Sequence, residues 1–365
     1  MSLSIGIVGL PNVGKSTLFN ALTQKSVPAE NYPFCTIDPS VGIVRVPDER
    51  LAKLSALSES ERTLPAVIEF VDIAGLVAGA AEGEGLGNKF LSNIRETDAI
   101  AQVVRIFEDP EIHHVSGSID PMRDVGVINL ELVLADLETV TKRKVAVERD
   151  AKRGEKDAKV ELDLVSRFEE VLSEGALAST LDLTEEEEKI AKHFHLLTKK
   201  PILYVLNTQT KEGVDMSEVN SKIQEFKDFA KDSQAKTVVV DAGLEGEFAT
   251  LSKEEREEMR KDFGAEGTGI DALIVEGYKL LDLISFFTTG EKESRAWTIA
   301  RGSTAPIAGS AIHSDFQDKF IRAEVIFWEK LLEAGSYAVA RERGWVRTEG
   351  KTYIVEDGDV MEFRI

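Results

Sequence analysis

Residues 9–16 of this chain read GLPNVGKS, which fits the pattern G-x-x-x-x-G-K-[ST]. Residues 3–8 precede the pattern and are apolar enough for a buried strand, whereas residues 17–22 follow it and suit a helix. In this order, a strand, a glycine-rich turn and a helix form a loop whose backbone N–H groups surround phosphate oxygens. The positive end of the new helix adds to the attraction for anions. The pattern therefore predicts a phosphate-binding loop at the start of an α/β domain.

The loop gives an expected role to each of its functional positions. Lys15 would reach the β- and γ-phosphates of a nucleoside triphosphate, and the Ser16 hydroxyl would ligate Mg²⁺. The two glycines allow the backbone to approach the phosphates closely. We therefore expect Lys15 to be catalytic and Ser16 to be a metal ligand. The expected nucleotide contacts are completed by Asn12, Val13, Gly14 and Thr17.

Length and composition restrict the class of protein. The chain has 365 residues, enough for two or three domains and a sizeable core. The net charge of −21 disfavours indiscriminate binding to polyanions, so no DNA partner is expected and any RNA contact needs a local basic surface. Cys35 is the only cysteine, which excludes an intrachain disulfide. The sequence has no leader pattern and no apolar run of roughly 18 residues, and we expect a cytoplasmic protein without a membrane partner.

Short apolar runs alternate with longer amphipathic stretches in the first part of the chain, and strand signals return later. Such alternation predicts a parallel-type α/β sheet with helices on both faces. The predicted strands are residues 4–8, 42–46, 67–71, 101–107, 202–206 and 237–240.

Residues 129–198 are different, because they are charged, nearly free of aromatic residues and helical in pattern throughout. We expect an α-helical hairpin inserted into the α/β domain. Its middle, residues 141–160, carries eight basic against four acidic side chains, opposite in sign to the whole chain. This charge is either a solvated helical face or a contact to the phosphate backbone of RNA. The basic residues are Lys142, Arg143, Lys144, Arg149, Lys152, Arg153, Lys156 and Lys159.

The pattern changes again after residue 277 and is typical of a small α+β module. The predicted strands there are residues 283–287, 296–300, 324–327 and 360–365, and the predicted short helices are residues 318–321 and 330–340. We therefore expect three domains. They are a nucleotide-binding domain at residues 1–128 and 199–277, a helical arm at residues 129–198 and the α+β module at residues 278–365.

A nucleotide-hydrolysing loop of this kind needs further groups around the metal and the terminal phosphate. Thr36 lies after the first helix, where a mobile hydroxyl completes Mg²⁺ coordination. Asp72 ends a predicted strand and would hold Mg²⁺ through a water molecule. Gly75 follows it, and its N–H would meet the γ-phosphate. The glycine-rich stretch beyond Gly75 is typical of a switch segment that the γ-phosphate orders.

The base-reading segment departs from that of a GTPase. Guanine is recognised by Asn-Lys-x-Asp after a strand, and the matching residues 207–210 read NTQT. Asn207 and Thr208 are expected to contact the nucleotide, but Thr210 stands where the guanine-binding carboxylate belongs. One hydroxyl cannot accept the two N–H groups of the guanine edge, so we expect ATP to be favoured over GTP. A shifted register that uses Glu212 would instead supply a carboxylate.

The group that activates water is less clearly marked. Leu76 follows Gly75, where a glutamine often orients the attacking water, and the leucine side chain cannot form a hydrogen bond. Another side chain or a partner must then place the water. His113 and His114 follow the fourth predicted strand and are candidates, although a histidine in a loop is usually only solvated.

Taken together, these motifs resemble the YchF/Obg-like ATPases, a family of P-loop proteins of the translation-factor class. The resemblance covers essentially the whole chain. It rests on residues 9–16, 31–39, 72–80, 83–91 and 94–96 in the nucleotide-binding part, and on residues 287–293, 295–298, 312–316, 319–325 and 357–360 near the end.

The resemblance implies a nucleotide-binding domain, an inserted coiled coil and a C-terminal ubiquitin-like TGS domain. It also implies ATP in preference to GTP, and association with the ribosome, chiefly the large subunit and its rRNA. The family's proposed catalytic histidine falls on His114, and Asn12 resembles an asparagine linked to K⁺ in related enzymes. The family usually shows Asn-x-x-Glu and Ser-Ala, where this chain has Thr210 at the glutamate position and Asp241 followed by Ala242.

We therefore expect a ribosome-associated ATPase that hydrolyses ATP to ADP and phosphate and acts as a nucleotide-dependent switch in translation or stress response. Two alternatives stay open at this point. One is a conventional GTP-specific switch GTPase whose base pocket uses Glu212. The other is a non-enzymatic scaffold that binds RNA or the ribosome and uses nucleotide only to hold its shape.

Overall fold

We describe the protein from a computed structural model. The description covers residues 3–24, 26, 38, 40–73, 87–109, 118–210, 216–232, 235–248, 251, 255–256, 258–259 and 269–365. The chain forms two compact units. The first comprises Met1–Gly42 and Glu69–Leu273, and the second comprises Ile43–Ile68 and Ile274–Ile365.

The first unit is built on a six-stranded sheet with the strand order β2-β4-β1-β5-β6-β7. From β4 to β7 the neighbours along this order pair in parallel. Every residue of β5 and β6 is buried, as expected for central strands covered on both faces. The strands are β1 (Ser4–Val8), β2 (Val41–Arg45), β4 (Val67–Asp72), β5 (Ala99–Arg105), β6 (Ile202–Asn207) and β7 (Lys236–Val240). All six predicted strands are confirmed, with ends displaced by at most two residues.

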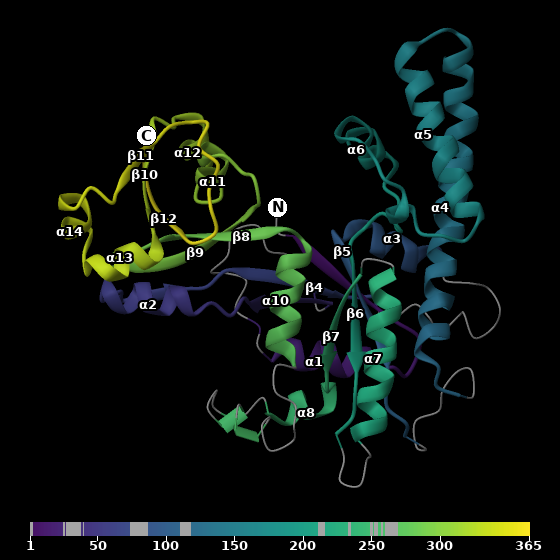
Figure 1. The fold of residues 1–365 in the computed structure, drawn as a ribbon, viewed down its shortest axis with the longest axis horizontal. Helices are drawn as coiled ribbons and strands as arrows, with labels where there is room; N and C mark the ends of the chain where they lie inside the picture. Colours follow the sequence, from purple (N-terminus) through teal and green to yellow (C-terminus); the bar gives the residue numbers. More distant parts are fainter. Residues whose placement is uncertain are drawn as a thin grey trace. The chain divides into compact units, whose positions relative to one another are not determined.

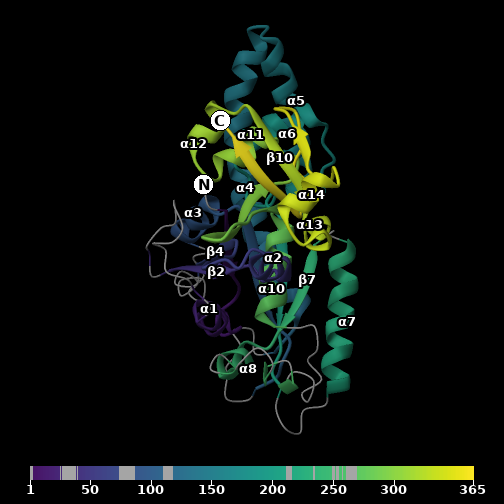
Figure 2. The ribbon, with the colours of Figure 1, turned by 90° about the vertical axis from the view of Figure 1, so that its left-hand side faces the viewer.

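Helices cover both faces of this sheet (Figures 1 and 2). α1 packs against α8, and α7 packs against α4. These four helices and α3 have the following bounds: α1 (Lys15–Thr23), α3 (Asn88–Glu96), α4 (Pro121–Lys152), α7 (Met216–Asp232) and α8 (Ala242–Glu247). The first unit therefore has the layered α/β architecture that the alternating pattern favours.

Residues 121–198 contain no strand and form a helical hairpin with short helices near its base, as the sequence pattern predicts. α4 is followed by α5 (Lys156–Ser173), and the turn between them passes through Gly154, whose φ of 91° is left-handed. The hairpin core includes Val140, Leu164 and Phe168. Figure 1 shows the hairpin extending beyond the sheet of its unit. The short helices are η3 (Ala178–Thr180), α6 (Glu185–Ala191) and η4 (Lys192–Phe194).

α4 begins at Pro121, earlier than residue 129, where the helical pattern was expected to start. Asp120 caps the helix, because its side chain accepts a hydrogen bond from the backbone N–H of Arg123. The first turns carry the buried side chains of Val125 and Ile128 and contact β5. One continuous helix therefore covers the sheet and then forms half of the hairpin, and no break in the pattern marks the transition.

The second unit is built on another six-stranded sheet, with the order β11-β10-β12-β8-β9-β3. Its strands are β3 (Arg62–Leu64), β8 (Leu283–Thr288), β9 (Glu293–Ala300), β10 (Arg322–Phe327), β11 (Arg347–Glu349) and β12 (Asp359–Arg364). Its helices are α2 (Glu49–Leu57), α11 (Ala305–Ser310), α12 (Ser314–Asp318), α13 (Trp328–Ala334) and α14 (Tyr337–Glu342). The four strands predicted for the C-terminal region are confirmed. β3 and β11 have three residues each, too few for a sequence pattern to detect.

Two helices predicted for this region are wrong. Residues 318–321 are not a helix, because α12 ends at Asp318 and β10 begins at Arg322. α12 starts earlier because His313 caps it, and its Nδ1 accepts a hydrogen bond of 3.1 Å from the N–H of Asp315. Residues 330–340 are not one helix, because Gly335 adopts a φ of 75° and separates α13 from α14.

The segment Ile43–Ile68 belongs to the second unit, whereas the sequence pattern places it in the nucleotide-binding domain. β3 pairs in parallel with β9, and the hydroxyls of Ser60 and Ser294 share a hydrogen bond of 2.7 Å. α2 contacts β9 and α13. The boundary between the units falls inside β2 and β4, and α10 (Ile270–Leu280) carries the chain into the second unit again.

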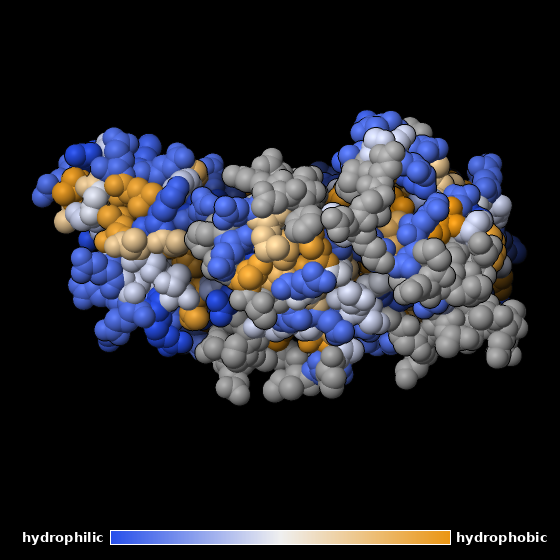
Figure 3. Space-filling model, turned by 90° about the horizontal axis from the view of Figure 1, so that it is seen from below, coloured by the Kyte–Doolittle hydropathy of each residue, from blue (hydrophilic) through white to orange (hydrophobic). Residues whose placement is uncertain are grey.

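One face of the molecule can be followed in Figure 3. On the face seen in Figure 3, hydrophilic residues surround smaller hydrophobic patches. This surface agrees with a charged-residue content of 30%. Among the helices of the described residues, none combines the length and the apolar composition needed to cross a bilayer.

Candidate nucleotide-binding site

The predicted phosphate-binding loop connects the end of β1 to the start of α1. It turns through Asn12 and Gly14, whose φ angles of 61° and 96° are left-handed. Asparagine tolerates this conformation better than most residues, and glycine has no side chain that would be strained. A Cβ atom at position 14 would lie 2.1 Å from Nδ2 of Asn207. Gly14 is therefore required twice, by its backbone angle and by the side chain packed against it.

Lys15, the first residue of α1, is buried within this loop. Its ammonium group donates a hydrogen bond of 2.6 Å to the carbonyl oxygen of Leu10. Burial lowers the pKa of Lys15 to about 8, and the negative charge of Asp72 opposes this shift. The structure thus brings Asp72, at the end of β4, within electrostatic range of the loop lysine. A phosphate bound here would offset the conflict between the charge of Lys15 and its burial.

Ser16 and Asp72 supply oxygen atoms where the metal ion is predicted. Ser16 is exposed in the first turn of α1, and Asp72 is half-buried. Mg²⁺ prefers oxygen ligands and keeps several of its waters, so the chemistry of a hydroxyl and a carboxylate fits this ion. Thr17, the neighbour of Ser16, is also exposed and lines the adjoining cavity.

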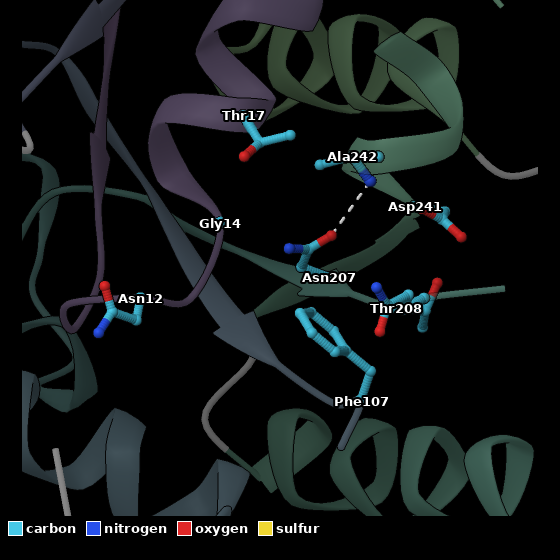
Figure 4. Close-up of a pocket in the computed structure, with 10 residues that line it drawn as sticks. Asn12, Gly14, Thr17, Phe107, Asn207, Thr208, Asp241 and Ala242 are labelled. Carbon is cyan, nitrogen blue, oxygen red and sulfur yellow. Dashed lines mark hydrogen bonds between the residues drawn. The ribbon is translucent and has the colours of Figure 1, made fainter. Parts of the chain in front are cut away.

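Asn207 connects three elements of the site (Figure 4). Its Nδ2 donates a hydrogen bond of 2.9 Å to the carbonyl oxygen of Val13 in the loop. Its Oδ1 accepts a hydrogen bond of 3.1 Å from the N–H of Ala242 at the start of α8. Because Asn207 ends β6 and is buried, its amide fixes the loop relative to both β6 and α8.

A cavity of about 250 Å³ lies beside this amide. It is found at the carboxyl ends of β5, β6 and β7, which is where open parallel sheets bind ligands. Five of the predicted nucleotide-binding residues line it, namely Asn12, Gly14, Thr17, Asn207 and Thr208. The other lining residues are Phe107, Gln209, Asp241, Ala242 and Gly243. These five other lining residues each follow the end of a strand by one to three residues. A position just after a predicted strand is therefore the sequence signal that points to them as lining residues.

Arg105, at the end of β5, holds Phe107 at the wall of this cavity. Its Nε donates a hydrogen bond of 3.0 Å to the Phe107 carbonyl, and its guanidinium lies 4.6 Å from the centre of the Phe107 ring. A second hydrogen bond, of 3.3 Å, runs from Nη2 to the Asp109 carbonyl. Burial lowers the pKa of Arg105, and nearby carboxylates, including that of Asp109, oppose this shift. In the sequence Arg105 is only one residue of an apolar strand, and no signal marks its role.

Three of the predicted site residues, Thr36, Gly75 and His114, lie outside the described residues, as do the alternatives His113 and Glu212. The roles assigned to them stay predictions. Within the described residues, the site consists of the phosphate loop, Asp72 and the cavity at the strand ends.

Comparison with known proteins covers both ends of the chain. Residues 4–134 match a family model described as a 50S ribosome-binding GTPase, and residues 283–365 match the model YchF-GTPase_C, described as a protein of unknown function. Proteins named ribosome-binding ATPase YchF are similar over the full length. The one from Bacillus subtilis (strain 168) is 51% identical and the one from Escherichia coli O157:H7 is 48% identical, over 100% of this chain and 99% of each relative.

The fold is also similar to a solved structure. The YchF GTPase of Schizosaccharomyces pombe matches with a TM-score of 0.88 and 35% identity, over 100% of this chain and 98% of that chain. The similarity therefore includes both the P-loop α/β fold and the C-terminal domain. The family resemblance inferred from the motifs is confirmed. With a phosphate loop at the end of β1, a cavity at the strand ends and relatives that match from end to end, this chain belongs to the YchF family.

Proposed function

We propose that this chain is an ATPase that hydrolyses ATP to ADP and phosphate, with GTP as a less favoured substrate. The observation that carries the proposal is the hydrogen bond from Asn207 to the Val13 carbonyl. It joins the phosphate loop to the cavity at the strand ends, so that a phosphate cradle and a space for a base lie side by side.

The chemistry of phosphoryl transfer is mainly positioning and electrostatic stabilisation. On this proposal Lys15 and the loop N–H groups stabilise the negative charge that develops at the γ-phosphate. Ser16, Thr36 and Asp72 are the residues that would hold Mg²⁺, Asp72 through a water molecule. Bound Mg²⁺ supplies neutralisation of the β- and γ-phosphate oxygens. The N–H of Gly75 contacts the γ-phosphate.

His114 is the proposed positioning group for the attacking water, because Leu76 cannot form a hydrogen bond with it. The support for His114 is the family resemblance together with its place after β5. Asn12 is the proposed contact for K⁺. Since the chain has no strong water-orienting side chain next to Gly75, we expect slow intrinsic turnover.

The preference for ATP rests on position 210. Thr210 offers no carboxylate to the guanine edge, and guanine discrimination depends on that carboxylate. The relatives from Bacillus subtilis and Escherichia coli are named ATPases, whereas the one from Schizosaccharomyces pombe is named a GTPase. Competition between ATP and GTP is therefore the decisive measurement.

We also propose that the protein associates with the ribosome, chiefly with the rRNA of the large subunit. The relatives from both bacteria are named ribosome-binding. Some basic residues of the hairpin are neutralised, as Arg143 is by Glu161 at 2.5 Å. Other basic side chains of the hairpin tip are exposed and make no ion pair or hydrogen bond to another described residue. They are those of Arg149, Lys152 and Lys159. They are suited to contact a phosphate backbone.

The remaining parts of the proposal concern architecture and setting. The helical hairpin is proposed to be a coiled coil, and the C-terminal part of the second unit a ubiquitin-like TGS domain. The protein would act in the cytoplasm as a nucleotide-dependent switch in translation or stress response. The support for these points is the membership of the YchF family.

Isothermal titration of ATP and of GTP, each with Mg²⁺ and with or without ribosomes, tests the proposal. We expect tighter binding of ATP than of GTP, and slow hydrolysis of ATP that the Lys15→Ala variant loses. Lys231→Ala, at an exposed lysine of α7, is the matched control. Undiminished hydrolysis by Lys15→Ala would contradict the assigned site, and tighter binding of GTP would contradict the base preference.

A further inference from the structure

Gln209 lies at the wall of the cavity with its hydrogen-bonding groups available. It follows the end of β6 by two residues, is half-buried and lines the cavity. Its side-chain amide makes no hydrogen bond to another described residue. An amide presents a donor and an acceptor in one plane, and this arrangement pairs with an amino group and an adjacent ring nitrogen of adenine. The chemistry needed to read an adenine edge is therefore present at this position.

One neighbour of Gln209 is attached to the end of β7, and the other is attached to the residue that caps α8. The N–H of Thr208 donates a hydrogen bond of 2.9 Å to the Val240 carbonyl. The N–H of Thr210 donates one of 2.6 Å to Oδ2 of Asp241. A residue held on both sides keeps its backbone position, so little conformational entropy is lost when its side chain binds a ligand.

Asp241 makes this attachment with a buried carboxylate. It is only 8% exposed, and its second oxygen, Oδ1, accepts a hydrogen bond of 3.0 Å from the N–H of Leu244 and thereby caps α8. Figure 4 shows Asp241 next to Ala242 at the start of this helix. Hydrogen bonds to a charged acceptor are stronger than those between neutral groups. Each oxygen of Asp241 already accepts one backbone N–H, so this carboxylate is engaged in holding the loop.

We propose that Gln209 is a further specificity-determining residue of this cavity, reading the N6 and N7 edge of adenine with its side-chain amide, and that Asp241 is a positioning residue that holds Gln209 in place through Thr210. The inference rests on the proposed function, because it assumes that ATP binds here. It adds the residue that recognises the base. Guanine presents two acceptors on this edge, O6 and N7, so one of them faces the amide oxygen, which is also an acceptor.

The first experiment measures the affinities of the full-length protein for ATP, GTP and inorganic tripolyphosphate, which has no base. Gln209→Ala should weaken ATP binding roughly tenfold, since a bidentate base contact is worth about 1–3 kcal/mol, and should leave tripolyphosphate binding unchanged. Gln209→Glu keeps an acceptor for the 6-amino group but removes the donor to N7 of adenine, so it should also weaken ATP binding. Gln224→Ala, on the surface of α7, is the matched control.

The second experiment tests the positioning role of Asp241. In Asp241→Ser the serine still caps α8, but its short side chain cannot reach Thr210, so ATP affinity should fall several-fold while the melting temperature changes little. Asp241→Asn is the second variant, since its amide keeps one acceptor oxygen. Asp120→Ser, which changes the capping aspartate of α4, is the control for capping alone. Base-free tripolyphosphate should bind equally to all four proteins.

A third measurement separates recognition from mere stability. Purine riboside triphosphate lacks the 6-amino group of ATP, so the wild-type protein should bind it more weakly than ATP, whereas Gln209→Ala should bind the two about equally. Equal binding of both nucleotides by the wild-type protein, or an unchanged ratio of ATP to GTP affinity in Gln209→Ala, would overturn the inference alone. If the wild-type protein binds ATP no better than tripolyphosphate, the proposed function is wrong as well.

Discussion

The side chains of Arg50 and Asp357 form two hydrogen bonds, of 2.9 and 3.2 Å, although 307 positions separate them in the chain. Arg50 also binds the carboxylate of Asp48, and its guanidinium lies 5.1 Å from the centre of the Phe287 ring. Burial opposes the charge of Arg50, but the two carboxylates raise its pKa above the ordinary value. α2 is thereby attached to the C-terminal strands, which explains why Ile43–Ile68 is part of the second unit.

Asp357→Ala should lower the free energy of unfolding of the second unit by about 1–2 kcal/mol, because it breaks the ion pair in a partly exposed and therefore screened position. It also removes the acceptor for the N–H of Ser285. All three tryptophans, Trp297, Trp328 and Trp345, lie in this unit, so their fluorescence during urea denaturation reports its stability. Glu356→Ala, at an exposed neighbour, is the control. A variant as stable as the wild type would show that the pair does not stabilise the unit.

Gly14→Ala should abolish tight nucleotide binding. The left-handed backbone angle alone costs about 1–2 kcal/mol for a residue with a side chain, and the new methyl group must displace the Asn207 amide that it would approach to 2.1 Å. The control is Gly126→Ala in α4, where an added Cβ would have nothing within 4 Å. This variant should raise the free energy of unfolding by about 0.5–1 kcal/mol. Titration calorimetry with ATP distinguishes the two, and retained affinity in Gly14→Ala would contradict the geometry of the loop.

Asp136→Ala should destabilise the base of the helical hairpin by about 2–4 kcal/mol, since it leaves buried donors without an acceptor. The fully buried carboxylate of Asp136 accepts hydrogen bonds from the N–H of Leu197 and from the N–H and hydroxyl of Thr198. Asp163→Ala on α5, at an exposed aspartate, should change stability by less than about 0.5 kcal/mol. Hydrogen exchange of the hairpin amides, compared between the two variants, measures the difference. Equal protection in both would contradict the prediction.

Alkaline pH should destabilise the second unit through Tyr278. Its hydroxyl donates a hydrogen bond of 3.0 Å to the Ile284 carbonyl, and burial raises its pKa from 10.0 to about 12. A raised pKa means that the folded state holds the proton longer than the unfolded state. The contribution is therefore complete below pH 10 and is lost as the pH rises through about 12, at about 1.4 kcal/mol per pH unit in between.

The pH dependence is measured by urea denaturation at several pH values between 10 and about 12, with tryptophan fluorescence as the signal of unfolding. Tyr278→Phe has no phenol to ionise, so its stability should fall less steeply with pH than that of the wild type. Parallel pH profiles for the two proteins would exclude Tyr278 as the cause.

Much of the first unit could be predicted because its signals are local. β1, the phosphate loop and α1 occupy adjacent residues, and each strand of the sheet is a short apolar run with a boundary visible in the sequence. Asn207 and Asp72 could be named because each ends such a run at a fixed offset from a strand. The hairpin helices could be predicted because their helical pattern is also local. The start of α4 could not, because the turns that pack on the sheet and the turns that form the hairpin share one uninterrupted helical periodicity.

The wall of the cavity was only partly predictable. Thr210 and Asp241 stood out as departures from a pattern, but nothing in the sequence showed that their backbone and side chain meet. Gln209 and Phe107 have ordinary identities, and they gain significance only because β5, β6 and β7 end at the same edge of the sheet. Arg105 is a charged residue inside an apolar strand, and its partners lie beyond the strand end.

By itself, the sequence determined the phosphate loop, the alternation of strands and helices and the family, since these depend on the identity and spacing of neighbouring residues. Only the tertiary structure decided that Ile43–Ile68 folds with the C-terminal strands and that four separate segments, which follow β1, β5, β6 and β7, form one cavity. The physical reason is that short-range periodicity records which face of an element is buried, but not which distant element covers it. That choice depends on packing and hydrogen bonds between residues as far apart as Arg50 and Asp357.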